Sequence, residues 1–218
     1  MPSDPTPAAA APVVGDRAAI VQLPFVLAAC CLGFVFGLEG GVLAVVACAA
    51  IWPPRVPWRP LAARRVLLGY VPFALVWLVF VVVYLRIANA CGFVIPPQPT
   101  LETMATQGTA MPGFVLAVFG IVVVAPVVEE VLFRGYLFTA LDLVLPRWAT
   151  QIATATVFGL LHGPAYALPI GVLSLYFGWQ RAKNGSLLPS ILAHAVHNGL
   201  TVAVTVLWPG HLEHLYPR

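Results

Sequence analysis

Residues 66–84 read VLLGYVPFALVWLVFVVVY, an apolar run without a single charged side chain. A helix needs about 20 mainly apolar residues to cross the hydrocarbon core of a bilayer, and this run is long enough. The whole chain of 218 residues is 61% hydrophobic and only 9% charged. Because soluble domains carry roughly a quarter charged residues, the composition predicts an all-α, polytopic transmembrane bundle.

Apolar segments on both sides of this run predict further crossings, about seven in all, within a range of six to eight. The Ala- and Pro-rich residues 1–17 lack the basic start of a secretory signal, so we expect a disordered tail before a transmembrane domain at 18–210. The expected spans are 18–37, 40–52, 66–84, 112–145, 149–161, 165–180 and 187–208.

The distribution of basic residues predicts how the spans are oriented in the membrane. If the arginine-rich loop after residue 52 is cytoplasmic, eight of the eleven Lys and Arg residues fall on that side and two on the other. This asymmetry follows the positive-inside rule and places the N-terminus in the cytoplasm. The eight are Arg17, Arg55, Arg59, Arg64, Arg65, Arg147, Arg181 and Lys183; the two are Arg86 and Arg218.

The net charge of +3 gives no indication of a nucleic-acid partner. The four cysteines, Cys30, Cys31, Cys48 and Cys91, form no CxxC pair, and three of them lie in apolar runs. We therefore expect packing rather than a disulfide or metal framework at these positions.

Charged side chains within apolar spans cost a few kcal/mol each on insertion scales, so they are functional candidates by default. Glu130 and Arg134 are i,i+4 neighbours on a helix and can form an ion pair, which by itself can be purely structural. Glu129 points about 100° further round the helix. It is left as an uncompensated carboxylate, which suits it to proton transfer.

Two further apolar helices carry polar pairs one turn apart. Phe158 precedes His162 by four residues, and an imidazole can share a proton with a carboxylate. His194 precedes Asn198 by four residues, and both can donate hydrogen bonds to an oxyanion. His197 projects about 60° from His194 and faces either the same cavity or a neighbouring helix. Each residue singly can also be a structural hydrogen-bonding group between helices.

Together these residues supply a base, a proton partner and two oxyanion donors, which favours hydrolysis of a peptide bond. A serine mechanism is disfavoured because no GxSxG is present. An aspartyl mechanism needs two aspartates, and Asp142 is the sole one after Asp16. A non-enzymatic immunity or partner-regulating protein and a proton-coupled transporter remain as alternatives.

The three motifs resemble those of the CAAX protease and bacteriocin-processing family, which includes Ras-converting CAAX endopeptidases and bacterial Abi-type proteins. The similarity extends over about 111–208, the expected catalytic core, and includes Ala125-Pro126 and the turn 184–187. The motifs are Glu129-Glu130-x-x-x-Arg134, Phe158-x-x-x-His162 and His194-x-x-x-Asn198.

The resemblance implies an intramembrane endopeptidase whose site opens toward the cytoplasm, with a bacterial inner membrane as its expected location. It implies that Glu129 activates water with help from His162, and that His194 and Asn198 form the oxyanion hole. Glu130 and Arg134, with Phe158, would support the site. The implied partners are the lipid bilayer and a membrane-associated peptide or protein, prenylated or not.

The sequence is compatible with a metal cofactor and with a metal-free site. The family is often described as metalloproteases, although a metal-free glutamate mechanism has also been argued for it. The sequence lacks HExxH, but Glu130, His162 and His194 could ligate zinc if the fold brought them together. Both zinc and a glutamate base fit these residues, and we favour the metal-free mechanism.

Overall fold

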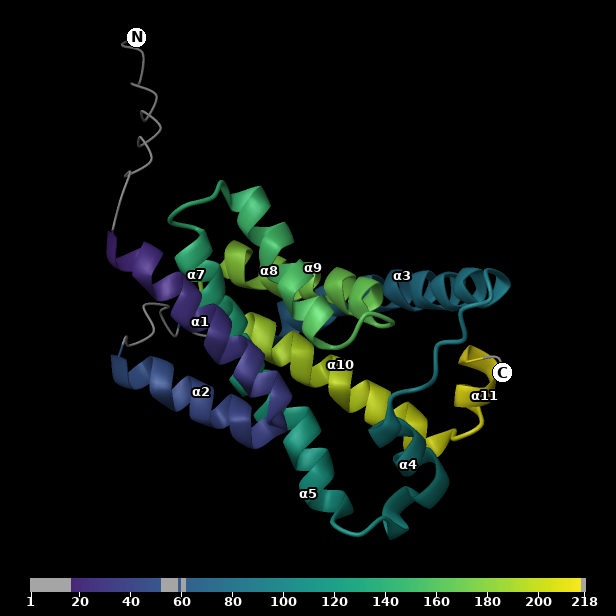
Figure 1. Ribbon diagram of the computed structural model, residues 1–218. Coiled ribbons are helices and arrows are strands. Elements are labelled where there is room, and N and C mark those ends of the chain that lie inside the picture. The colour runs from purple at the N-terminus through teal and green to yellow at the C-terminus, as the bar shows by residue number, and fades with distance from the viewer. Residues whose placement is uncertain (1–16, 52–58, 60–61, 217–218) are drawn as a thin grey trace.

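The structure is a computed structural model and describes residues 17–51, 59 and 62–216. The predicted tail lies outside this part except for Arg17, and so does most of the arginine-rich loop. The described part contains helices and no strand, which confirms the all-α class (Figure 1). The helices are α1 Arg17–Val35, α2 Gly37–Ile51, α3 Ala63–Ala90, α4 Pro99–Gln107, α5 Phe114–Phe119, α6 Ala125–Glu130, α7 Phe138–Leu141, α8 Arg147–Leu161, α9 Ala167–Asn184, α10 Leu188–Leu207 and α11 His211–Leu215.

Three helical stretches of the described chain are long and apolar enough to cross a membrane: 63–90, 114–141 and 188–207. α3 has 28 residues, so it is about 42 Å long at about 1.5 Å per residue. Its outer face carries large apolar side chains such as Leu68, Val76 and Val79, each more than 60% exposed. Such a face is stable against lipid and not against water. The chain is thus an integral membrane protein, and the expected number of seven crossings stays a prediction.

The stretch 114–141 is one continuous helix with two π-helical segments, η2 (Gly120–Val124) and η3 (Val131–Leu137). At the end of η2 the Ala125 N–H bonds to the Gly120 carbonyl, five residues back. Pro126 follows directly and has no N–H to donate, so the regular ladder is already interrupted there. The two segments flank α6 and rotate Glu129 and Glu130 relative to the rest of the helix.

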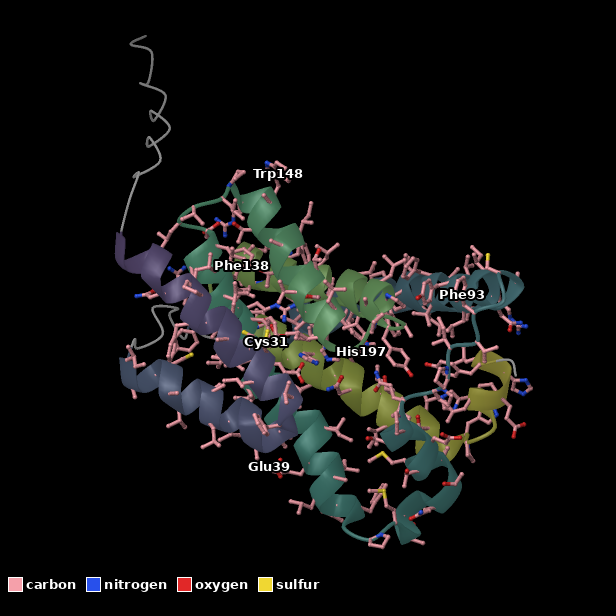
Figure 2. All side chains as sticks on the ribbon, in the orientation of Figure 1. Cys31, Glu39, Phe93, Phe138, Trp148 and His197 are labelled. Carbon is pink, nitrogen blue, oxygen red and sulfur yellow. The ribbon has the colours of Figure 1, made fainter. Side chains whose placement is uncertain are left out.

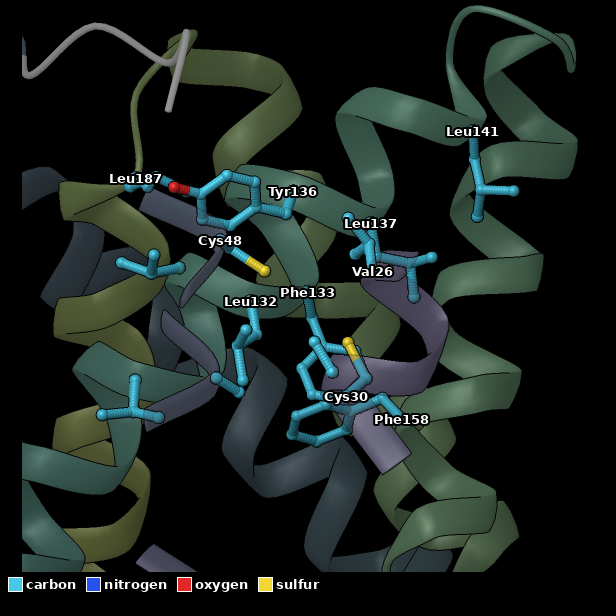
Figure 3. Packing of buried hydrophobic residues seen from close by; sticks show 14 residues of the cluster. Val26, Cys30, Cys48, Leu132, Phe133, Tyr136, Leu137, Leu141, Phe158 and Leu187 are labelled. Carbon is cyan, nitrogen blue, oxygen red and sulfur yellow. The ribbon is translucent and has the colours of Figure 1, made fainter. Parts of the chain in front are cut away.

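The α1–α2 hairpin packs against this interrupted helix. Gly33 and Gly41 let the two arms approach closely, since an added Cβ on Gly33 would lie 3.2 Å from the Gly41 Cα. Buried side chains from the hairpin, from η3 and from α8 form one core, and Figure 3 shows Cys30 near Phe133 and Phe158.

α10 lies centrally and packs against α3, α9 and the helix that carries both glutamates, while α8 and α9 form a second hairpin (Figure 1). Gly159 makes that hairpin tight because a Cβ there would meet the Ala167 carbonyl.

Three boundaries differ from the prediction. The stretch between the expected spans 66–84 and 112–145 is partly helical, since α3 continues to Ala90 and α4 occupies Pro99–Gln107. Arg64 and Arg65 lie in the first turn of α3 rather than in the loop. Arg147 begins α8, two residues before the expected start of the span 149–161, because Pro146 in an extended conformation is well suited to precede a helix.

Candidate functional site

The predicted site residues lie on three helices that meet in the interior. Glu129 and Glu130 end α6, and His162 follows the last residue of α8. His194 and Asn198 lie one turn apart on α10. Glu129 is 12 residues from the end of α7, about 18 Å along the helix at about 1.5 Å per residue. The site is therefore deep within the helical layer.

Glu130 and Arg134 form the predicted ion pair. Arg134 Nη1 lies 3.0 Å from Glu130 Oε1, and both side chains are fully buried. Arg134 Nη2 also donates to the Ser174 carbonyl at 2.9 Å and to Ser174 Oγ at 2.6 Å, which ties α9 to the pair. Because a buried charge is stable only when it is paired and hydrogen-bonded, this network holds the end of α6 in place.

His194 lies between the two carboxylates. Its Nδ1 is 2.9 Å from Glu130 Oε1, so this nitrogen carries the hydrogen that the carboxylate accepts. Its Nε2 is 3.8 Å from Glu129 Oε2. The ring stacks on Phe177 with centroids 4.5 Å apart and an interplanar angle of 19°, which limits its rotation.

His162 approaches the same Glu129 oxygen from α8. Its Nε2 lies 4.0 Å from Glu129 Oε2. Its Nδ1 is 2.7 Å from the Phe158 carbonyl, and since a carbonyl only accepts, Nδ1 is the protonated nitrogen. Glu129 Oε2 is buried and accepts no hydrogen bond from any described residue, although two ring nitrogens face it. The separations of 3.8 and 4.0 Å exceed hydrogen-bond length and leave a gap among the three groups.

Asn198 and His197 complete the α10 face. Asn198 Nδ2 donates one hydrogen bond to the Ile121 carbonyl at 2.9 Å, and its amide carries a second N–H. His197 Nδ1 lies 2.8 Å from the Tyr70 hydroxyl on α3, and Figure 2 labels this residue near the middle of the molecule. His197 thus bonds a neighbouring helix and also lines the cavity that Glu129 faces.

A cavity of about 300 Å³ reaches these residues. Its polar lining includes Glu129, His162, His194 and Asn198, and much of its wall is apolar or aromatic. An apolar pocket with a few convergent polar groups is the usual form of a ligand site. Among the residues that form the wall are Trp77, Tyr84, Leu85, Leu101, Tyr166, Leu173 and Val202.

The zinc set suggested by the sequence does not fit this geometry. Glu130 Oε1 is already bonded to Arg134 and to His194 Nδ1, and His162 faces Glu129 instead. Within the described chain, no three His, Cys, Asp or Glu side chains form a group that could hold a metal ion.

Several residues of the network were not predicted from the sequence. Ser174 is one of these residues, and in the structure its Oγ accepts a hydrogen bond from Arg134. Arg181 was counted only as a cytoplasmic charge, yet its Nε donates to the Arg134 carbonyl at 2.9 Å. The one available signal was the presence of polar residues in the otherwise apolar α9. Phe177 and Tyr70 gave no signal, because aromatic residues are common on any membrane helix.

One family model matches the chain. Residues 111–200 match the family model described as type II CAAX prenyl endopeptidase Rce1-like. The predicted family resemblance is confirmed. The Rce1-like segment contains both glutamates, Arg134, His162, His194 and Asn198, so all three motifs lie within the matched range. No curated protein and no solved structure matches the chain.

Proposed function

We propose that this protein is an intramembrane endopeptidase that hydrolyses peptide bonds with a water molecule activated by Glu129. The observation that carries the proposal is the convergence of His162 Nε2 and His194 Nε2 on Glu129 Oε2, at 4.0 and 3.8 Å. These groups line one cavity with Asn198. The match to a family of CAAX prenyl endopeptidases supports the reaction class.

In this mechanism the water occupies the gap between Glu129 and the two imidazoles. Glu129 takes a proton from the water while the water oxygen bonds to the scissile carbonyl carbon. His162 accepts a second hydrogen bond from the water and orients it. The proton then passes from Glu129 to the leaving nitrogen, the C–N bond breaks, and the products are a carboxylic acid and an amine.

The developing oxyanion is stabilised from α10. Asn198 offers the N–H that it does not donate to Ile121. His194 has a carboxylate on each side of its ring, and its Nε2 faces the gap beside Glu129, where an N–H on this nitrogen would donate to the oxyanion. Glu130 and Arg134 act as positioning residues.

The first test is Glu129→Gln, which keeps the side-chain shape and removes the base. General-base catalysis contributes roughly 10²–10⁴-fold, so we expect cleavage to fall by at least about 100-fold. Comparative membrane proteomics of cells with the intact protein and with Glu129→Gln would identify the substrate as an accumulating precursor. Purified protein and that precursor would then give the rate.

Glu39→Gln is the matched control, since Glu39 is exposed at the start of α2 and does not line the catalytic cavity. It should cleave at the normal rate. If Glu129→Gln retained full proteolysis, the glutamate-base mechanism would be wrong. A non-enzymatic immunity or partner-regulating role would replace the protease under two joint conditions. No precursor would differ between cells with the intact protein and cells with any variant, and Glu129→Gln would restore the phenotype of cells that lack the protein.

Zinc is tested on the same purified protein. We expect substoichiometric metal and full activity after chelation, because Glu130 is engaged by Arg134 and His194. Stoichiometric zinc whose removal abolishes cleavage would contradict the metal-free mechanism.

A further inference from the structure

One buried histidine of the catalytic cavity has no part in the proposed hydrolysis. His197 lies three residues after His194 on α10 and is only 9% exposed. It belongs to none of the three motifs, yet it lines the cavity together with Glu129 and Asn198. A polar group within a membrane helix is costly unless it finds partners, so the partners of both its ring nitrogens matter.

Tyr70 on α3 determines which nitrogen carries the hydrogen. The buried Tyr70 hydroxyl lies 2.8 Å from His197 Nδ1, and within the described chain it makes no other hydrogen bond. If Nδ1 carried the hydrogen, the Tyr70 O–H would be buried without an acceptor, which is unfavourable. Tyr70 therefore donates to Nδ1, and the hydrogen of the neutral imidazole is on Nε2.

Aromatic side chains hold the ring of His197 in place. Trp77 contacts it edge to face, with centroids 4.6 Å apart and an interplanar angle of 88°, and Trp77 Nε1 itself donates to the Pro169 carbonyl at 3.1 Å. Phe177 lies 6.5 Å from the same ring and stacks on His194 at 4.5 Å. His197 Nε2 bonds no described residue, so a preorganised N–H donor is available in the cavity.

The chemistry of this donor restricts its partner. No Lys or Arg is among the described residues that line the cavity, and Glu129 brings a negative charge to it, so a carboxylate is a poor ligand there. A neutral N–H in an apolar wall instead suits a neutral acceptor, such as a peptide carbonyl. No ion pair joins His197 to an acidic side chain of the described chain, which agrees with a neutral ring.

The spacing on α10 gives the position of that carbonyl. His194 and His197 differ in height by about 4.5 Å along the helix, at about 1.5 Å per residue. An extended peptide advances about 3.3 Å per residue. A substrate whose scissile carbonyl lies at His194 and Asn198 therefore passes His197 within about three residues of the scissile bond.

We propose that the Tyr70–His197 pair anchors the substrate backbone, with His197 Nε2–H donating to a peptide carbonyl within about three residues of the scissile bond. The pair is then a binding element that fixes the register of the peptide relative to Glu129. This inference specifies how the proposed protease holds its substrate, and it rests on that proposed function.

Two substitutions separate the two nitrogens of His197. In His197→Asn the amide lies at the place of Nδ1, so the bond to Tyr70 is kept and the Nε2 donor is lost. In His197→Gln the amide lies one carbon further out, at the place of Nε2, so the donor is kept and the bond to Tyr70 is lost. Both are made in the Glu129→Gln protein, so that binding is measured without cleavage.

His211→Asn in the same protein is the matched control. His211 is also buried and its Nδ1 is bonded to the Trp208 carbonyl, but it does not line the catalytic cavity. The probe is a fluorescent synthetic peptide that covers the cleaved segment of the precursor accumulating in Glu129→Gln cells.

We expect His197→Asn to raise the Kd of the peptide about 10-fold, whereas His197→Gln and His211→Asn should stay within about twofold of the parent. Stability should follow the opposite order, because only His197→Asn keeps the partner of Tyr70: His197→Gln should unfold at a lower temperature than His197→Asn. In protein that retains Glu129, His197→Asn should raise KM and leave kcat nearly unchanged, as expected when ground state and transition state lose the same bond.

Backbone esters locate the bonded carbonyl, because an ester carbonyl accepts hydrogen bonds more weakly than an amide carbonyl. One ester within about three residues of the scissile bond should weaken binding to the parent about 5-fold and have no further effect on His197→Asn. If every ester had the same effect on both proteins, the proposal would be overturned.

Equal Kd values for His197→Asn and His197→Gln would also overturn it, as would a larger loss in His197→Gln, since binding would then depend only on the bond to Tyr70. A peptide that binds according to the expected order but is not cleaved by the intact protein would contradict the protease instead. The two failures are therefore distinguishable.

Discussion

At the residue scale, the site depends on two adjacent glutamates that do different things. Glu130 is fully buried and bonds Arg134 and His194, whereas Glu129 faces the catalytic cavity. Adjacent residues on a helix point about 100° apart, so one glutamate of the pair can bond a structural partner while the other faces a cavity. The Glu130 carboxylate thus holds the site in place, and the Glu129 carboxylate is the one that we propose reacts.

Replacement of Glu130 by glutamine should destabilise the protein strongly. The change removes the counter-ion of Arg134, and breaking a buried pair on one side costs about 3–5 kcal/mol. The free energy of unfolding in detergent micelles would measure the loss. Glu102→Gln, at an exposed position, should change it by no more than about 0.5 kcal/mol.

A double variant shows whether the stability loss in Glu130→Gln comes from the unpaired charge of Arg134 or from the changed shape of the side chain. Glu130→Gln with Arg134→Met removes both charges and should recover part of the lost stability, since no unpaired cation remains. Equal stability of Glu130→Gln and Glu102→Gln would show that the pair contributes nothing to the fold.

At the scale of single elements, the α8–α9 hairpin sets the position of His162. His162 follows α8 directly, three residues after Gly159, and its ring is held by the Phe158 carbonyl. Gly159 has no room for a side chain, because the Ala167 carbonyl and the Gly171 nitrogen occupy the space. The separation of α8 from α9 therefore controls how close His162 comes to Glu129.

Gly159→Ala should weaken both stability and cleavage. Its Cβ would push the hairpin apart, and overpacking typically costs about 1–3 kcal/mol. The displaced His162 would lower the cleavage rate. Gly171→Ala is the matched control on the same interface, where the nearest atom, the Ala155 carbonyl oxygen, is at an ordinary 3.6 Å. Unfolding and cleavage are measured for both; similar values for the two variants would contradict the packing argument.

At the scale of the whole molecule, α10 joins the two ends of the bundle. It contributes His194 and Asn198 to the site and contacts α3, α4, α6 and α9. α1 and α2 have 19 and 15 residues, and α8 has 15, so these elements are at or below the length of an ordinary crossing. Apolar helices shorter than the bilayer are accommodated by local thinning of the bilayer or by flanking side chains that extend to its surface.

Reporter fusions test the number of crossings. With seven crossings, the N-terminus and C-terminus lie on opposite sides of the membrane. A fluorescent protein that folds only in the cytoplasm should therefore fluoresce at the N-terminus and stay dark at the C-terminus, and an alkaline phosphatase should show the reverse. Fluorescence at both termini would mean six or eight crossings.

The sequence by itself determined the features that depend on composition and local spacing. Membrane embedding follows from the apolar runs, and the Glu130–Arg134 pair follows from the four-residue spacing on one helix. The motif residues could also be chosen in advance, because charged and imidazole side chains are costly within apolar helices. The family match rests on these same residues.

Only the tertiary structure decided how those residues meet. Glu129 and the two imidazoles come from helices more than 30 positions apart, and their approach depends on packing that no local period encodes. The π-helical segments change the angle of the helix around Glu129, and Arg134 bonds Ser174 on α9 as well as its predicted partner Glu130. Each is a long-range property, because helix faces are matched by shape and hydrogen bonding between elements rather than by spacing within them.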